Sequence, residues 1–321
     1  MTPSLLVADI GGTNARFATA ARREGRICIE NYTVLAGGDF RTFDDALRHF
    51  LDLSGVKPGL AAIAAAGPVL GGALHLTNRN WSVSEAALRD TFGFSGVTLF
   101  NDFVAMARSV PEMGAAAFLP VFDGEAAPGA PVLVTGPGTG FGVATLVSLD
   151  EGWKVLGGEG GHMAYAPRTA LERELAGLLM RDHGYVSNEL VASGSGLAAV
   201  HAAFCEMFDV ELAPATPAEM SARAAGGDEM YQALIQVRAL AVMGAAGDLA
   251  LANGALGGVV LAGGVSEKFW DIFRSPEARE RFAARGPMSR FLERCPVRLL
   301  HEDTAPLIGA AAQFGQMRAD H

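Results

Sequence analysis

The stretch that decides the fold is Leu5-Leu-Val-Ala-Asp-Ile-Gly-Gly-Thr-Asn-Ala-Arg-Phe-Ala-Thr-Ala20. A short apolar run reaches Asp9, two glycines and a threonine follow, and a second apolar run begins at about Arg16. Residues 26–34 can form a third strand, so a β-meander is expected to open the protein. The two glycines let backbone N–H groups point into one concavity, as in an anion nest, and Asp9 can hold Mg²⁺ directly or through its water shell.

A similar pattern recurs at a constant offset of 126 residues, between Thr13 and Thr139. In both copies an apolar strand enters a Gly-Thr turn and a second apolar strand leaves it. Two such hairpins facing each other would clamp a polyphosphate, whereas the alternative is a pair of ordinary tight turns. The repeat together with Asp9 favours phosphate binding, although neither loop is a Walker A or a GxGxxG motif.

Farther along the chain, strand and helix signals are mixed, which is typical of the α/β class. The Ser82-Val-Ser-Glu85 sequence predicts a capping box that starts a helix ending near Phe92. The Ala-, Gly- and Pro-rich residues 113–131 predict a domain boundary near their start. Further strands are expected at residues 60–65, 97–100, 131–135, 143–148, 258–261 and 297–301, and helices at 43–53, 170–182, 196–208, 218–253 with a break near 226–227, and from 305.

Composition excludes several classes of protein. Half of the 321 residues are hydrophobic and 19% are charged, which rules out a disordered polymer. The formal net charge of −10 would repel phosphate backbones and anionic lipid, so nucleic-acid and membrane-surface binding are not expected. Three widely spaced cysteines argue against a disulfide framework and fit a reducing cytosol. The N-terminus lacks the features of a signal peptide, and the apolar residues 249–265 are interrupted by glycines, so they predict buried elements and no membrane span.

Two segments carry groups suited to a hydroxyl-bearing substrate. Asn101 and Asp102 end a predicted strand in front of a helix, where open α/β sheets place ligand groups, and a carboxylate there can accept a hydroxyl proton. The alternative is an Asx turn that caps the next helix. Four glycines surround Glu159 before His162, and this carboxylate and imidazole suit a polyol. A metal is the rival interpretation there, but no second His or Cys lies at ligand spacing.

Seven motifs in order resemble the bacterial ATP-dependent glucokinase family, within the sugar kinase/Hsp70/actin-like superfamily. They are Asp9-Ile-Gly-Gly-Thr-Asn-Ala-Arg16, Thr77-Asn-Arg-Asn-Trp81, Phe100-Asn-Asp-Phe103, Gly136-Pro-Gly-Thr-Gly-Phe-Gly142, Gly158-Glu-Gly-Gly-His162, Ser187-Asn-Glu189 and Leu261-Ala-Gly-Gly-Val265. Each motif alone is weak, but the ordered set spans almost the whole chain. The related ROK branch carries a cysteine-rich zinc motif after the Gly-Gly-His segment, and residues 163–188 contain no cysteine, so the sequence resembles the non-zinc branch and not ROK. The first strand begins so early that no DNA-reading helix-turn-helix is expected ahead of it.

The resemblance implies two actin-like (ribonuclease H-like) α/β domains, with mixed sheets flanked by helices and an interdomain cleft. The small domain would comprise residues 1–111 and 298–321, and the large domain residues 112–297. The implied ATP-binding residues are Asp9, Ile10, Gly11, Gly12, Thr13, Asn14, Gly138, Thr139, Gly140, Gly263 and Gly264. The implied glucose-binding residues are Asn101, Asp102, Glu159, His162 and Glu189, with Asp102 as the general base for the 6-hydroxyl. Without the resemblance, Glu189 would be interpreted as a solvated loop acid.

The implied reaction is phosphoryl transfer from ATP to D-glucose, which gives glucose 6-phosphate and ADP. Mg²⁺ would arrive with ATP near Asp9, with no metal held by protein ligands alone. The resemblance further implies a cytoplasmic homodimer that serves glycolysis. Two alternatives stay open: a kinase for another hexose or amino sugar, and a sugar- or nucleotide-gated sensor with little turnover. The acid at Asp102 argues against the sensor, because a sensor needs no base.

Overall fold

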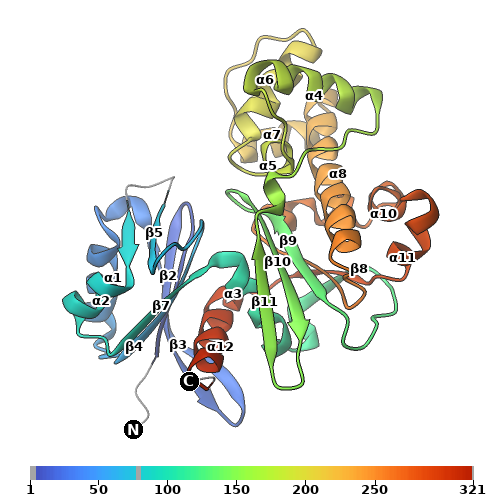
Figure 1. Ribbon diagram of the computed structural model, residues 1–321. Coiled ribbons are helices and arrows are strands. Elements are labelled where there is room, and N and C mark those ends of the chain that lie inside the picture. Colours follow the sequence, from blue (N-terminus) through green and yellow to red (C-terminus); the bar gives the residue numbers. More distant parts are fainter. Residues whose placement is uncertain (1–4, 77–80, 320–321) are drawn as a thin grey trace. The chain divides into compact units, whose positions relative to one another are not determined.

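The computed structural model describes residues 5–76 and 81–319 (Figure 1). It is α/β, and the chain packs into two compact units that are each discontinuous in sequence. The first comprises residues 1–117, 148–157 and 302–321, and the second comprises residues 118–147 and 158–301. Residues 148–157 include most of strand β11 (Trp153–Gly158). These units differ from the predicted domains at residues 112–117, 148–157 and 298–301.

The first unit is built on a five-stranded sheet in the order β3-β2-β1-β4-β7. The three-strand meander predicted from the sequence is confirmed, because β1 (Leu5–Ile10), β2 (Asn14–Arg23) and β3 (Arg26–Ala36) pair antiparallel. Beyond β1, the sheet continues with parallel strands β4 (Leu60–Ala65) and β7 (Gly96–Asn101). A separate ribbon joins β5 (Ala73–His75) to β6 (Ser82–Ser84).

Helices cover both faces of this sheet because its central strands are apolar on both sides. Leu6, Ala8 and Ile10 of β1 pack in a core that includes residues of α1 (Phe43–Ser54) and α2 (Glu85–Phe92). Val7 faces the opposite way, into a core with residues of α3 (Asp102–Ser109) and α12 (Ala305–Ala319). The alternation follows from the two-residue period of a strand. It yields a helix–sheet–helix sandwich whose parallel strands end at one common edge.

The start of α2 differs from the predicted capping box. Ser84, and not Ser82, caps the helix, and its hydroxyl accepts the Ala87 N–H at 3.5 Å. Ser82 belongs to β6 and pairs with His75. The Glu85 carboxylate is used elsewhere, since it accepts the backbone N–H of Leu99 in β7 at 2.9 Å. Glu85 therefore forms a tertiary hydrogen bond to Leu99 in place of the local hydrogen bond to Ser82 that a capping box requires.

The second unit contains strands in the order β10-β9-β12-β13-β8. β9 (Val132–Pro137) and β10 (Phe141–Ser148) form an antiparallel hairpin, β12 (Gly258–Leu261) runs parallel to β9, and β13 (Val297–Leu300) runs parallel to β12. The edge strand β8 (Phe118–Phe122) was not predicted and lies within the Ala-, Gly- and Pro-rich residues 113–131. The last strand of the chain therefore pairs in the second sheet.

Helices of the second unit surround the long helix α8 (Glu229–Ala252). This is the one helix among the described residues long and apolar enough to cross a membrane by length and composition, and 67% of its apolar window is buried inside the protein. The predicted break in residues 218–253 is confirmed by a cap at Asp228. The other helices are α4 (Ala170–His183), α5 (Asn188–Ala192), α6 (Leu197–Met207), α7 (Pro217–Ala225), α9 (Trp270–Phe273), α10 (Pro276–Ala283) and α11 (Ser289–Glu293).

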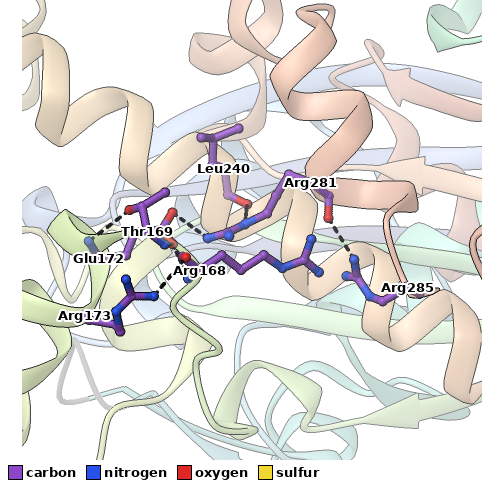
Figure 2. Close-up of polar contacts among 7 residues, drawn as sticks. All are labelled: Arg168, Thr169, Glu172, Arg173, Leu240, Arg281 and Arg285. Atoms are coloured by element: carbon purple, nitrogen blue, oxygen red, sulfur yellow. Dashed lines mark hydrogen bonds and ion pairs between the residues drawn. The ribbon is translucent and has the colours of Figure 1, made fainter.

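A buried ion pair ties α4 to α10 and α8 (Figure 2). Glu172 Oε1 lies 2.5 Å from Arg281 Nη2, and both residues are almost fully buried. The other Glu172 oxygen accepts the backbone N–H groups of Arg168 and Thr169, while Arg281 Nε donates to the Leu240 carbonyl at 3.3 Å. The charges of Glu172 and Arg281 compensate each other. Removing one of the two side chains would leave the other charge buried without its partner, which lowers the free energy of unfolding by about 3–5 kcal/mol.

Candidate active site

In the first unit, the candidate groups lie at the carboxyl ends of the parallel strands. Asp9 pairs in register with Ala64 of β4, which pairs with Phe100 of β7, so Asn101 ends a strand two positions along the sheet. At the usual strand spacing this separates the two backbones by roughly 10 Å. This is the edge where open α/β sheets bind ligands. The structure therefore brings the residues from Asp9 to Asn14 and the pair Asn101–Asp102 to one edge.

Asp9 is buried, with 5% of its surface exposed, and its Oδ2 lies 2.8 Å from Arg16 Nη1. Burial raises the pKa of the Asp9 carboxyl, and the neighbouring Arg16 guanidinium opposes this shift. The strand register explains the pair, since Asp9 and Arg16 are directly opposite in the β1–β2 hairpin. The sequence analysis did not identify Arg16 as the partner of the candidate residue Asp9.

Asn101 and Asp102 form the N-terminus of α3. The Asn101 side chain accepts the backbone N–H groups of Phe103 and Val104 and donates to the Gly67 carbonyl at 3.2 Å. The capping alternative is therefore confirmed for Asn101. Asp102 is half-buried at the first helical position, and its Oδ1 accepts the Phe103 N–H at 2.9 Å. The helix N-terminus stabilises the charged form of such a carboxylate.

The two glycine hairpins share a topology and differ in register. Ile10 pairs with Ala15 across a four-residue turn, whereas Pro137 pairs with Phe141 across a three-residue turn. At the positions equivalent to the Asp9–Arg16 pair, the Thr135 hydroxyl donates to the Gly142 carbonyl at 2.9 Å. The internal repeat therefore forms two β-hairpins, each with a side-chain hydrogen bond between the aligned positions, and the turn of the second hairpin is one residue shorter.

Glu189 contacts the second glycine loop, residues 136–142. Its Oε2 accepts the backbone N–H of Phe141 at 2.7 Å, and the residue is half-buried in the first turn of α5. The interpretation of Glu189 as a solvated loop acid is therefore wrong. The carboxylate also lines a polar recess of about 270 Å³ with Tyr185, Ser187 and Ser195, so it is accessible to a ligand as well.

The Gly160-Gly161-His162 turn packs against the same loop. A side chain at Gly161 would collide with the Phe141 carbonyl, which explains glycine there. Glu159 and His162 are both exposed, with Oε2 and Nε2 4.0 Å apart. The Tyr185 hydroxyl donates to the His162 carbonyl at 2.9 Å, which joins this turn to the segment leading into α5. The turn between Glu159 and His162 and the carboxylate of Glu189 therefore both contact the loop that carries Gly138, Thr139 and Gly140.

The turn that contains Gly263 and Gly264 contacts the loop at Pro137. Gly263 has φ +89°, and a Cβ there would lie 2.5 Å from the Pro137 carbonyl oxygen. The Val265 N–H donates to that same carbonyl at 3.2 Å. Glycine is required both by the left-handed backbone and by this close approach.

A groove of about 680 Å³ begins beside this loop, at Gly194, and runs along α6. Leu197, Ala198 and His201 form one wall, and residues 210–217 form the other. The helix predicted over residues 196–208 is confirmed by α6, and Gly194 lies just before it. The contact of Gly194 with the loop had no local sequence signal. Among the described residues, no group of three or more His, Cys, Asp or Glu side chains could hold a metal.

Comparison with known proteins decides the family. A glucokinase family model matches residues 6–317. A glucokinase of Saccharophagus degradans is 37% identical over 97% of this chain and 98% of its own, and one of Chromobacterium violaceum is 37% identical over 98% and 89%. The chain belongs to the glucokinase family. The resemblance carried by the seven motifs is thereby confirmed.

Solved glucokinases share the fold. The glucokinase of an Antarctic psychrotroph superposes with a TM-score of 0.85 at 36% identity, covering 98% of this chain and all of the other. A glucokinase of Balamuthia mandrillaris, solved with glucose, has a TM-score of 0.80 at 21% identity, covers 98% of this chain and 94% of its own, and shows the fold alone. The α/β, actin-like fold class predicted from the sequence is confirmed. Of the family motifs, residues 77–80 lie outside the described residues, while Trp81 is buried.

Proposed function

We propose that this member of the glucokinase family transfers the γ-phosphoryl group of ATP to the 6-hydroxyl of D-glucose. The observation that carries the proposal is the match to glucokinases along almost the whole chain. Asp102, a half-buried carboxylate at the carboxyl end of a parallel strand, is the group we assign as general base. Asn101, Glu159, His162 and Glu189 are assigned to glucose, whose vicinal hydroxyls need paired donors and acceptors.

In the proposed reaction, the 6-hydroxyl oxygen attacks the γ-phosphorus and its proton passes to the Asp102 carboxylate. The new bond joins the sugar oxygen to phosphorus, and the bond from the γ-phosphorus to the bridging oxygen breaks to release ADP. Phosphoryl transfer of this kind depends mainly on positioning and charge stabilisation. Asp102 would take up this proton late, because the acceptor hydroxyl is deprotonated late in a loose transition state.

ATP is assigned to residues 9–14, to the loop residues 138–140 and to Gly263 and Gly264. The groove along α6 would take the nucleoside end, because it starts where the Gly194 N–H contacts the Gly138 carbonyl. Mg²⁺ prefers few carboxylates together with water and phosphate oxygens, so an ATP-bound ion near the single carboxylate of Asp9 fits this donor set. The ion would neutralise phosphate charge.

Three further assignments accompany this function. We infer that the enzyme acts in the cytoplasm, which fits its free cysteines, Cys28, Cys205 and Cys295. We also infer a homodimer and a place in glycolysis, on the basis of the family. Analytical ultracentrifugation of the purified enzyme tests the dimer, because a monomer at micromolar concentration would overturn it.

The proposed reaction is tested by a phosphorylation screen of hexoses against several phosphoryl donors. We expect ADP release from ATP to depend on D-glucose and to yield glucose 6-phosphate. Preference for mannose, glucosamine or an N-acetylated amino sugar would replace glucose as the acceptor. Tight glucose binding by calorimetry without turnover would instead indicate a sensor.

A further inference from the structure

Arg238 is a buried arginine in the middle of the apolar helix α8, with 6% of its surface exposed. Its guanidinium donates to the carbonyls of Val191, Ala192 and Ser193, at 3.2, 3.1 and 2.6 Å. Within the described part of the chain it forms no ion pair with a carboxylate. Burial lowers the pKa of Arg238 to about 10. A buried charge without an acid partner is costly, so the three carbonyl contacts are its compensation.

These carbonyls belong to the segment of residues 189–195, which begins in α5 and ends before α6. Both ends of the segment bind the second glycine loop. At one end the Glu189 carboxylate accepts the Phe141 N–H at 2.7 Å. At the other end the N–H groups of Gly194 and Ser195 donate to the carbonyls of Gly138 and Thr139, both at 2.9 Å. Arg238 thus binds the middle of a segment whose two ends are hydrogen-bonded to the loop.

The hydrogen bonds to the Gly138 and Thr139 carbonyls also orient two N–H groups of the loop. In a trans peptide the C=O and N–H point in opposite directions. Because the Gly138 and Thr139 carbonyls point at the segment, the N–H groups of Thr139 and Gly140 point away from it. Within the described residues, neither of these two N–H groups donates a hydrogen bond. Two neighbouring unpartnered amides are the donors that an anion nest needs.

We propose that Arg238 is a positioning residue for nucleotide phosphate, which acts through the 189–195 segment to aim the Thr139 and Gly140 amides. This rests on the proposed function, since the nucleotide is the ligand of the loop. Because Arg238 is buried and its guanidinium donates to carbonyls of this segment, it would act through the segment and not by touching the nucleotide. Its guanidinium suits the task because a planar fork with several donors can bind successive carbonyls at once, which a lysine ammonium does less well.

The test compares Arg238→Met, which keeps the length and apolar bulk of the side chain, with Arg238→Lys and with Met243→Ala. Met243 is fully buried in the same helix, so its truncation destabilises the unit without removing a donor to the segment. We expect Arg238→Met to raise KM for ATP and Kd for ADP by on the order of tenfold to a hundredfold and to lower kcat. Arg238→Lys should recover part of the loss. Met243→Ala should lower Tm and leave both constants unchanged.

A second readout needs neither nucleotide nor turnover. Hydrogen exchange of the ligand-free protein should be faster at the amides of Phe141, Gly194 and Ser195 in Arg238→Met than in Met243→Ala. Unchanged KM, Kd and exchange in a folded Arg238→Met variant would overturn the proposal. Equal changes in Met243→Ala would also overturn it, because they would reflect general destabilisation. Failure of the wild-type protein to phosphorylate glucose would refute the proposed function instead, and would leave the exchange result interpretable.

Discussion

The Asp102→Asn variant separates the proposed base from its structural surroundings. Asn retains an oxygen that can accept the Phe103 N–H, which now lies 2.9 Å from Asp102 Oδ1, and the N-cap of α3, Asn101, is unchanged. The loss of charge at the first helical position costs about 0.3–1 kcal/mol. For a protein of this size, that lowers Tm by at most about 4 °C. A general base contributes about 10²–10⁴-fold, or roughly 3–5 kcal/mol of barrier.

We therefore expect kcat to fall by about 10²–10⁴, while glucose affinity falls by less than about tenfold, because the amide still offers a donor and an acceptor to the sugar. A coupled assay of ADP release gives kcat, and calorimetry with glucose alone gives Kd. Asp45→Asn is the matched control, since Asp45 is a first-turn acid of α1 and its loss should leave kcat unchanged. A kcat within tenfold of wild type, or a Kd that rises as much as kcat falls, would refute the base assignment.

Three other predictions concern burial, the groove and pH. The Asp9→Asn variant should lose ATP-dependent turnover, but its Tm at neutral pH should be unchanged or higher. Burial raises the pKa of the Asp9 carboxyl, so the charged carboxylate opposes folding above the ordinary carboxyl pKa. A lower Tm together with normal activity would contradict this prediction. The Ala198→Trp variant should fill the groove and weaken ADP binding at least tenfold, whereas the control Ala222→Trp, on the exposed side of α7, should leave ADP binding unchanged. Calorimetry measures both affinities. Equal ADP affinities of the two variants would place the nucleoside outside this groove. Burial lowers the pKa of His201, so the unfolded state binds the proton at a higher pH than the folded state does, and stability should fall as the pH drops below the ordinary pKa of histidine. The His201→Gln variant should therefore show a flatter dependence of Tm on pH. An unchanged slope would refute this reasoning.

Local sequence signals predicted much of the secondary structure. The β-meander, the glycine hairpins and the break before α8, together with the Asx-turn alternative at Asn101, each depend on hydrogen bonds between residues close in sequence or on strand and helix periodicity. The exception at Ser82 is instructive. Its pattern matched a capping box, but Glu85 bonded to Leu99, 14 residues away, and Ser84 became the cap.

In the candidate site too, some features were predictable from local sequence and others were not. Sequence order and residue type identified the motifs, and with them the family, because turns and short loops encode their own geometry in glycine, threonine and asparagine. Only the tertiary structure showed that Glu189 holds Phe141, 48 residues away, and that Arg238 holds Ser193 across 45 residues. It also placed β13 beside β12. Such contacts depend on how separate elements pack, and neither partner's neighbours in the chain specify which distant carbonyl or amide it will meet.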